Sequence, residues 1–355
     1  MQTTMRGLVK EVAGPSELVY HDDLPVPVIG DDEVLIKVHC TAICGTDIHM
    51  LDWDEWSRKR LHPPVILGHE TAGDIVAVGK NVTDRKVGDR VSVETHIYCG
   101  ECYFCKNNMP HICSNMIGFG VAVDSAFAEY FKIRSDCTFL LDDEISYEAA
   151  CMFEPMGAGV HGVESAEVED KVVLVSGCGA IGLTAISACK VFGAKYVIAC
   201  DLLDSRLELA KEMGADAVFN SGKVNVYEEV RKLTDGLGCD AAIDITGAEA
   251  AINNALKSLR AAGKLVCVGL PSKPVTLVDM ADDLVYREVT VTGVSGRLIW
   301  DTWSDFGEVM KSPYYKLDKL IGGRFALEDY ETAFKQVRDG VPGKVLLYPQ
   351  GVSEA

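Results

Sequence analysis

The sequence predicts an α/β chain with two domains, one mainly β and one built on a doubly wound parallel sheet. At 355 residues, the chain is longer than one hydrophobic core usually organises. Its pattern also changes: short β-branched runs broken by Gly, Pro and Asp extend to about Tyr147, and buried strands alternate with helical segments from Lys171. We therefore expect one domain over residues 1–155 and 298–355 and a second over 156–297.

The first domain is predicted from short β runs and from the tail of the chain. Strands are expected at Glu33–Val38, Gly73–Val78 and Arg90–Val93. After residue 297, the pattern predicts helical segments at Asp305–Met310 and Leu327–Arg338 and a last strand at Lys344–Tyr348. We assign this tail to the first domain.

The second domain is predicted from apolar runs that are separated by helical segments. Its strands are expected at Val172–Val175, Tyr196–Cys200, Ala241–Ile245, Lys264–Val268 and Thr290–Thr292. The 18 residues Val172–Cys189 carry no charge, which is long enough to suggest a membrane span. A strand, a glycine turn and a helix explain the same stretch better, so no membrane segment is predicted.

A dinucleotide site is predicted where the second domain begins. Gly177-Cys-Gly179-Ala-Ile-Gly182 follows a strand and opens a helix, the context that gives this glycine pattern its weight. The glycines allow a tight turn and a close approach of the pyrophosphate to the helix N-terminus. Asp201 ends the next strand, where an acid bonds the adenosine ribose and repels a 2′-phosphate. We expect NAD, although Arg206 keeps NADP open, and the alternative role of the glycines is helix packing.

Four cysteines at short spacing predict a metal site in the first domain. Cys99, Cys102, Cys105 and Cys113 have the spacing of a structural zinc loop, and a closed four-cysteine site leaves no open coordination position for catalysis. An iron–sulfur cluster is the rival, but Cys113 is followed by Ser114 and not by the proline of the ferredoxin run. The chain has 13 cysteines, an odd number that favours a reducing compartment over a disulfide framework.

A second group of metal-ligand residue types lies before this loop. Cys44-Gly-Thr46-Asp-Ile-His49 and Gly68-His69-Glu70 offer a thiolate, imidazoles and a carboxylate. Mixed ligands of this kind, with one position left open, are typical of catalytic zinc. Each residue taken alone is more often structural, so the prediction depends on their combination.

These elements, in this order, resemble the zinc-dependent medium-chain alcohol and polyol dehydrogenases over essentially the whole chain. Within that family, the chain most resembles the threonine 3-dehydrogenase branch. The shared stretches are Asp52-Trp-Asp-Glu-Trp56, Val93-Glu-Thr-His96-Ile, Phe127-Ala-Glu-Tyr130, Phe153-Glu154-Pro155 and Gly296-Arg297 followed by Trp300-Asp-Thr-Trp303. The resemblance implies a GroES-like fold for the mainly β catalytic domain, a Rossmann fold for the NAD-binding domain, and two zinc ions per chain.

The resemblance also implies site residues, position by position. Cys44, His69 and Glu70 would bind the catalytic zinc, while Glu154 would contact the zinc, hold a water or join proton transfer. Thr46 and His49 match the proton relay. The cofactor would be lined by Gly177, Gly179, Ile181, Gly182, Asp201, Arg206, Val268, Gly269, Leu270, Val294 and Ser295.

The substrate is expected from the same resemblance. For the threonine branch, the reaction is oxidation of the L-threonine 3-hydroxyl by NAD to 2-amino-3-oxobutanoate and NADH. Arg297 could pair with the substrate carboxylate, or serve the cofactor or the structure instead. His96 resembles a substrate-side residue, with a core histidine as the alternative. A polyol or vicinal diol remains a second candidate substrate, and a nucleotide-binding protein without catalysis is the third hypothesis.

The net charge and the N-terminal segment limit the possible partners and the location of the protein. The chain has 34 Lys and Arg against 53 Asp and Glu, a net charge of −19, which disfavours nucleic acid and anionic membranes as partners. The N-terminal segment lacks the apolar region of a signal peptide, so we expect a cytoplasmic protein with a small-molecule substrate. The family resemblance implies a homotetramer.

Overall fold

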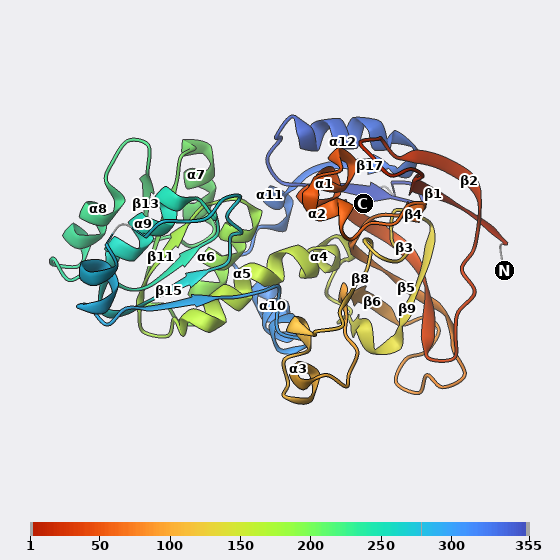
Figure 1. The fold of residues 1–355 in the computed structure, drawn as a ribbon, viewed down its shortest axis with the longest axis horizontal. Coiled ribbons are helices and arrows are strands. Elements are labelled where there is room, and N and C mark those ends of the chain that lie inside the picture. The colour runs from red at the N-terminus through yellow and green to blue at the C-terminus, as the bar shows by residue number, and fades with distance from the viewer. Residues whose placement is uncertain (1–2, 278, 353–355) are drawn as a thin grey trace. The chain divides into compact units, whose positions relative to one another are not determined.

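The computed structural model describes residues 3–277 and 279–352 and divides into two compact units (Figure 1). The first unit contains residues 1–155 and 320–355, and the second contains residues 156–319. Helix α5 (Phe153–Ala166) runs across the boundary near Pro155. The combination of a mixed, mainly antiparallel sheet in one unit and a parallel sheet in the other confirms the predicted fold class.

The first unit is built on a seven-stranded sheet in which β10, β6, β5, β3, β18 and β17 are neighbours in this order and β9 pairs with β3. A three-stranded sheet has the order β2-β1-β4, and β7 pairs with β8. Its strands are β1 (Thr4–Lys10), β2 (Val19–Pro25), β3 (Glu33–Ile43), β4 (Val65–Ile66), β5 (Glu70–Val78), β6 (Arg90–Val93), β7 (His96–Ile97), β8 (Ile117–Gly118), β9 (Tyr130–Arg134), β10 (Thr138–Leu140), β17 (Ile321–Ala326) and β18 (Lys344–Tyr348).

Short helices connect these strands. They are α1 (Gly45–Asp52), α2 (Glu55–Arg58), α3 (Tyr103–Lys106), α4 (Tyr147–Cys151), α12 (Tyr330–Arg338) and the 3-10 turns η1 (Pro110–Ile112), η2 (Ser135–Cys137) and η4 (Leu327–Asp329). One core of this unit joins Leu8, Met50 and Phe127 to Phe334 and Leu347 from the end of the chain. The predicted return of the last strand to the first domain is therefore confirmed for β18, which pairs with β3.

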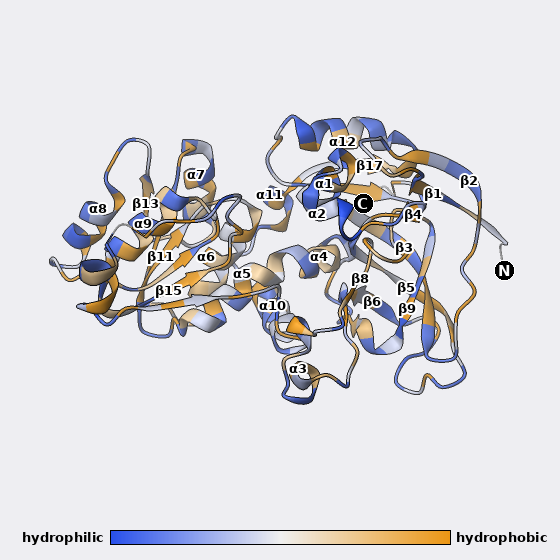
Figure 2. Cartoon of the chain, in the orientation of Figure 1, coloured by the Kyte–Doolittle hydropathy of each residue, from blue (hydrophilic) through white to orange (hydrophobic). Residues whose placement is uncertain are grey.

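The second unit contains a six-stranded parallel sheet with the order β13-β12-β11-β14-β15-β16. Helices α6 and α7 pack against each other, as do α8 and α9, and hydrophobic residues, coloured orange in Figure 2, lie along the strands. The strands are β11 (Val172–Ser176), β12 (Tyr196–Asp201), β13 (Ala217–Asn220), β14 (Cys239–Asp244), β15 (Leu259–Cys267) and β16 (Thr290–Gly293). The helices besides α5 are α6 (Ala180–Val191), α7 (Asp204–Glu212), α8 (Val226–Leu233), α9 (Glu249–Ser258), α10 (Asp301–Lys311), α11 (Leu317–Leu320) and the π-helical turn η3 (Ala281–Val285).

Residues 298–319 lie in the second unit, whereas the sequence pattern assigns them to the first domain. The physical reason is the packing of α10 on α6. Trp303 and Phe306 of α10 are buried, and the Ser187 hydroxyl of α6 donates a hydrogen bond to the carbonyl of Tyr314 at 3.2 Å. These contacts hold residues 298–319 in the second unit, which contains the parallel sheet.

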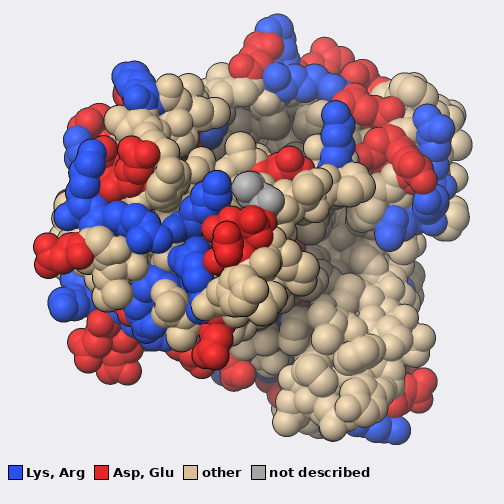
Figure 3. Space-filling view, turned by 60° about the vertical axis from the view of Figure 1, so that its left-hand side comes forward, with Lys and Arg blue, Asp and Glu red and all other residues tan. Residues whose placement is uncertain are grey.

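The charge-free stretch 172–189 is strand β11, a glycine turn and most of α6. Within the described residues, none of the helices combines the length and the apolar character needed to cross a bilayer. On the face drawn in Figure 3, acidic and basic side chains are interspersed. The acidic excess of the sequence is therefore not a continuous acidic surface on that face.

Candidate active site

Three candidate ligands converge inside the first unit. The Cys44 thiol, the His69 imidazole and a Glu70 carboxylate oxygen lie within 4.8 Å of one another. Cys44 precedes α1, and Glu70 is the first residue of β5, which pairs with β3 so that Glu70 stands opposite Ala42. Sheet pairing thus brings together ligands that are separated in the sequence.

The environment of Glu70 fits a cation. Its Oε1 accepts a hydrogen bond from Lys344 of β18, and its Oε2 is buried without a hydrogen-bond partner. Burial raises the pKa of the Glu70 carboxyl, against the opposing charge of the Lys344 ammonium, and the nearby charge of Glu154 raises it further. A buried oxygen without a partner is costly, and a metal ion would satisfy it.

His69, like Glu70, has a buried polar atom without a hydrogen-bond partner. Its Nδ1 lies 3.5 Å from Asp47 Oδ1 and has no hydrogen-bond partner, although it is buried. Burial lowers the pKa of His69, but the charges of Asp47 and Cys44 outweigh this effect and raise it. Asp47 Oδ2 accepts the backbone N–H of Cys44 at 2.8 Å, so the same carboxylate fixes Cys44 and lies close to His69. Asp47 stands in the motif that contains Cys44, but the motif alone does not show this contact.

Glu154 lies beside this group but is not one of the three grouped ligands among the described residues. It is the second residue of α5, and its Oε1 accepts a hydrogen bond from the Thr95 hydroxyl at 3.0 Å. Its charge acts on both Glu70 and Lys344. The structure therefore places a carboxylate next to the candidate ligands and gives it a fixed orientation.

The two predicted relay residues lie on α1. Thr46 Oγ1 is 3.6 Å from Cys44 Sγ. His49 follows one turn later, with its side chain 66% exposed and its Nδ1 3.3 Å from Asp54 Oδ2. Residues three apart on a helix share a face, so Thr46, close to Cys44, and the exposed His49 lie on the same side of α1.

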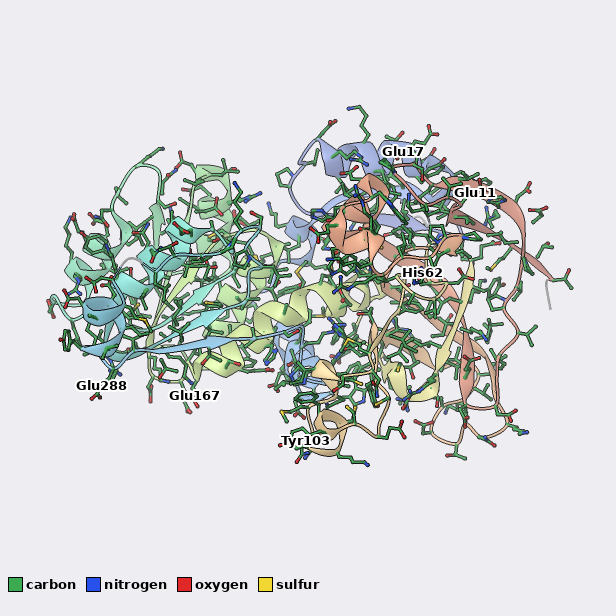
Figure 4. All side chains as sticks on the ribbon, in the orientation of Figure 1. Glu11, Glu17, His62, Tyr103, Glu167 and Glu288 are labelled. Atoms are coloured by element: carbon green, nitrogen blue, oxygen red, sulfur yellow. The ribbon has the colours of Figure 1, made fainter. Side chains whose placement is uncertain are left out.

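The four-cysteine loop forms a separate group with its thiols within 4.8 Å of one another. Backbone N–H groups of Cys99 and Asn115 each lie 3.3 Å from Cys113 Sγ, and hydrogen bonds from the backbone of Cys105 and Ser114 lower the pKa of Cys102 to about 6. Such donors favour thiolates, the form that binds metal. In Figure 4, Tyr103 of α3 projects outward from this loop. All thirteen cysteines lie within the described residues and are free thiols.

The glycine turn of the second unit has the geometry of an anion site. Gly177 has a φ of +97°, and a Cβ on Gly182 would lie 1.8 Å from the Gly177 carbonyl oxygen. Gly179 is the N-cap of α6, and nothing lies within 4 Å of where its Cβ would be. Ile181 is in the first turn of the helix. The backbone can therefore approach a phosphate at the N-terminus of α6.

Asp201 lies at the carboxyl end of β12, as predicted. Its Oδ2 accepts the N–H of Cys178 at 2.8 Å, and its Oδ1 accepts the N–H of Leu203 at 2.9 Å. Arg206 lies 3.7 Å from the same carboxylate. The acid is held in place beside the glycine turn, and the arginine is paired with it.

The other predicted cofactor residues follow the strands on the far side of the sheet centre. Val268, Gly269 and Leu270 come directly after β15, and Val294 and Ser295 come directly after β16. Leu270 is 91% exposed. Because the sheet order reverses between β11 and β14, these carboxyl ends border the position where parallel sheets bind nucleotides.

The two predicted substrate residues differ in their surroundings. His96 opens β7, and its Nδ1 lies 2.7 Å from the buried carboxylate of Glu94. Arg297 is only 2% exposed, and its guanidinium lies 5.7 Å from the centre of the Trp303 ring. This burial favours the structural or cofactor alternatives for Arg297 over a direct substrate contact.

Known protein families match both units. The alcohol dehydrogenase GroES-like domain matches residues 30–143, and the zinc-binding dehydrogenase domain matches residues 180–312. An L-threonine 3-dehydrogenase of Symbiobacterium thermophilum is 38% identical over 350 residues, covering 98% of this chain and 99% of that protein.

Two solved dehydrogenase structures match the fold of nearly the whole chain. The 2R,3R-butanediol dehydrogenase of Bacillus subtilis has a TM-score of 0.86 and 29% identity, covering 98% of this chain and 100% of that one. A short chain alcohol dehydrogenase of Escherichia coli CFT073 in complex with NADH has a TM-score of 0.87 and 27% identity, with the same coverage.

Proposed function

We propose that this chain, which belongs to the zinc-binding alcohol dehydrogenase family, oxidises the 3-hydroxyl of L-threonine with NAD. The products are 2-amino-3-oxobutanoate, NADH and one proton. The observation that carries the proposal is the 38% identity, over nearly the whole of both chains, to an L-threonine 3-dehydrogenase. The butanediol dehydrogenase is less similar, at 29% identity, which makes a vicinal diol the second candidate substrate.

Zinc fits the group formed by Cys44, His69 and Glu70. The donor set of one thiolate, one imidazole and one carboxylate suits this ion, and the partnerless Glu70 Oε2 is the oxygen that it would satisfy. When bound, zinc would polarise the substrate hydroxyl as a Lewis acid, and NAD would accept the hydride. Lys344 and Asp47 would hold the ligands in position.

The protein's own part in the reaction is to orient the substrate and to carry its proton away. The Thr46 hydroxyl would accept the substrate proton while it gives up its own, and the exposed imidazole of His49 would pass a proton to solvent. Glu154, held through Oε1 by Thr95, would hold a water with its other oxygen or join the proton transfer. His96 would contact the amino acid portion of the substrate.

The preference for NAD over NADP rests on Asp201. Its carboxylate is fixed by two backbone N–H groups next to the glycine turn, where it would bond the ribose hydroxyls and repel a 2′-phosphate. Arg206 lies near the same carboxylate, which offsets its attraction for a phosphate.

Metal content, assembly and location complete the proposal. The four-cysteine loop would hold a structural zinc, giving two zinc ions per chain. We propose a homotetramer, supported by the edge position of β16, whose outer side has no neighbouring strand among the described residues. A cytoplasmic location accords with thirteen free cysteines.

The test is a screen of NAD reduction with L-threonine, D-threonine, L-serine, sorbitol and butane-2,3-diol. L-threonine is expected to give the highest kcat/KM, and NADP is expected to be the poorer acceptor. Good turnover of a polyol without activity on threonine would replace the proposed substrate with the diol class.

A further inference from the structure

Between β6 and β7, the chain carries a buried carboxylate that the proposed oxidation and proton transfer do not use. Glu94 is 0% exposed, and its Oε1 accepts the backbone N–H of His96 at 2.8 Å. The same oxygen lies 2.7 Å from Nδ1 of the His96 ring. The side chain of Glu94 therefore folds onto the residue two positions later and fixes both its backbone and its ring.

The backbone around this pair is held on both sides. The N–H of Glu94 donates to the carbonyl of Cys137 at 2.9 Å, and the N–H of Phe119 donates to the carbonyl of Thr95 at 3.0 Å. His96 itself pairs with Gly118 in the β7–β8 ladder. The histidine and its carboxylate are thus positioned before any ligand binds, which reduces the entropy lost on binding.

This segment also reaches the candidate zinc site. Thr95, between the two residues of the pair, donates its hydroxyl hydrogen to Glu154, whose charge acts on Glu70. The pair therefore belongs to the same part of the first unit as the candidate ligands.

The hydrogen bond determines which ring nitrogen faces a ligand. An ionised carboxylate only accepts hydrogen bonds, so Nδ1 of His96 carries the hydrogen. Nε2 is then the ring nitrogen left for a ligand. The side chain of His96 is 24% exposed, so part of it is open to solvent.

We propose that Glu94 determines specificity by acting through His96, so that the site selects alcohols with an ammonium group beside the reacting hydroxyl. This inference rests on the proposed function, in which His96 contacts the substrate. Nε2 accepts a hydrogen bond from the ammonium, and the buried negative charge of Glu94 attracts that cation. A neutral diol gains nothing from this charge. Glu94 is thus a positioning residue that distinguishes amino alcohols from polyols.

The experiment divides the charges of threonine between two analogues. 3-Aminobutan-2-ol keeps the ammonium without the carboxylate, and 3-hydroxybutanoate keeps the carboxylate without the ammonium. With E94Q, kcat/KM for L-threonine and 3-aminobutan-2-ol should fall by about 10- to 100-fold, the effect of one hydrogen bond to a charged group. The values for 3-hydroxybutanoate and butane-2,3-diol should stay within about twofold, and an analogue that is not oxidised is measured as a competitive inhibitor.

Two further variants show whether Glu94 acts through His96. E94D, which keeps the charge, should recover part of the preference for ammonium substrates. In the background of H96Q, the E94Q change should have no further effect on that preference. E129Q is the matched control, because Glu129 is also buried in the first unit but pairs with Arg6 at 2.8 Å. This control should lower stability without changing the substrate ratios.

The possible failures are distinguishable. If the wild-type protein does not oxidise L-threonine, the proposed function fails. If the wild-type protein does oxidise L-threonine, but E94Q lowers kcat/KM for all four substrates equally or for none, the inference about Glu94 fails. The proposed function then still stands. If E94Q does not fold, E94D and H96Q decide, and unchanged ratios in both overturn the inference.

Discussion

The two candidate metal sites of this chain use different ligands and are built in different ways. The four cysteines lie within 15 consecutive residues, on a local loop that contains α3 and the 3-10 turn η1. The group of Cys44, His69 and Glu70 is assembled from the start of α1 and the start of β5. The first can be recognised by its spacing alone. The second exists only because β3 and β5 pair.

The contacts around the two sites also differ, because those of the four-cysteine loop are local and those of Glu70 come from a distant part of the chain. In the loop, local N–H groups satisfy the sulfur of Cys113, whereas Glu70 relies on Lys344, which lies 274 residues later in the chain. The mixed group keeps buried atoms without partners, Glu70 Oε2 and His69 Nδ1. A closed site with satisfied ligands suits a structural role, and a group that keeps buried atoms without partners suits chemistry.

The largest effect is expected when a ligand of the mixed group is removed. C44S should lower kcat/KM for L-threonine by about 1,000-fold or more, because Lewis-acid stabilisation of several kcal/mol is lost. Steady-state NADH formation measures this loss, and circular dichroism is the control for folding. Retention of more than a tenth of the activity would contradict the assignment of Cys44 as a catalytic ligand.

Removing a ligand of the four-cysteine loop should lower stability and leave turnover largely unchanged. C102S should lower the melting temperature and the zinc content, because binding energy at a structural site is folding energy. The protein that remains folded should turn over threonine at close to the normal rate. Normal stability with lost turnover would reverse the roles of the two sites.

The buried ion pair provides the next test. K344Q leaves the Glu70 charge without its partner and should cost about 3 kcal/mol in the free energy of unfolding of the zinc-free protein. The matched control is K335Q, which breaks an exposed pair with Asp339 and should cost less than about 1 kcal/mol. Urea unfolding measures both, and equal losses would show that Lys344 has no special role at Glu70.

The smallest effect concerns the orientation of Glu154. T95V removes the hydroxyl that donates to Glu154 and should lower kcat about 10-fold, the scale of losing a supporting hydrogen bond at a metal site. T95S keeps the hydroxyl and should stay within about twofold. If T95V and T95S behave alike, the hydrogen bond does not orient Glu154.

Contiguous patterns predicted most of the fold. The expected strands at Arg90–Val93 and Lys344–Tyr348 coincide with β6 and β18, and Asp201 ends β12 as the glycine motif requires. Periodicity and turn residues act locally, so a single sequence reveals them.

Contacts between distant segments were not predictable in this way. The pairing of Lys344 with Glu70 depends on the place of β18 beside β3, which no local pattern encodes. The bond from Thr95 to Glu154 likewise joins two segments whose approach is set by tertiary packing. The placement of residues 298–319 failed for the same reason, because the packing of α10 on α6 has no local signal.

The most direct test of the difference between the two sites is stepwise removal of zinc with a chelator, with metal content, threonine oxidation and melting temperature followed together. Two zinc ions per chain are expected at the start. The site with three protein ligands should release its zinc first, so activity should disappear as the content falls from two to one while the melting temperature changes little. Loss of the melting transition before loss of activity, or full activity with one zinc per chain, would contradict the separation of structure and chemistry between the two sites.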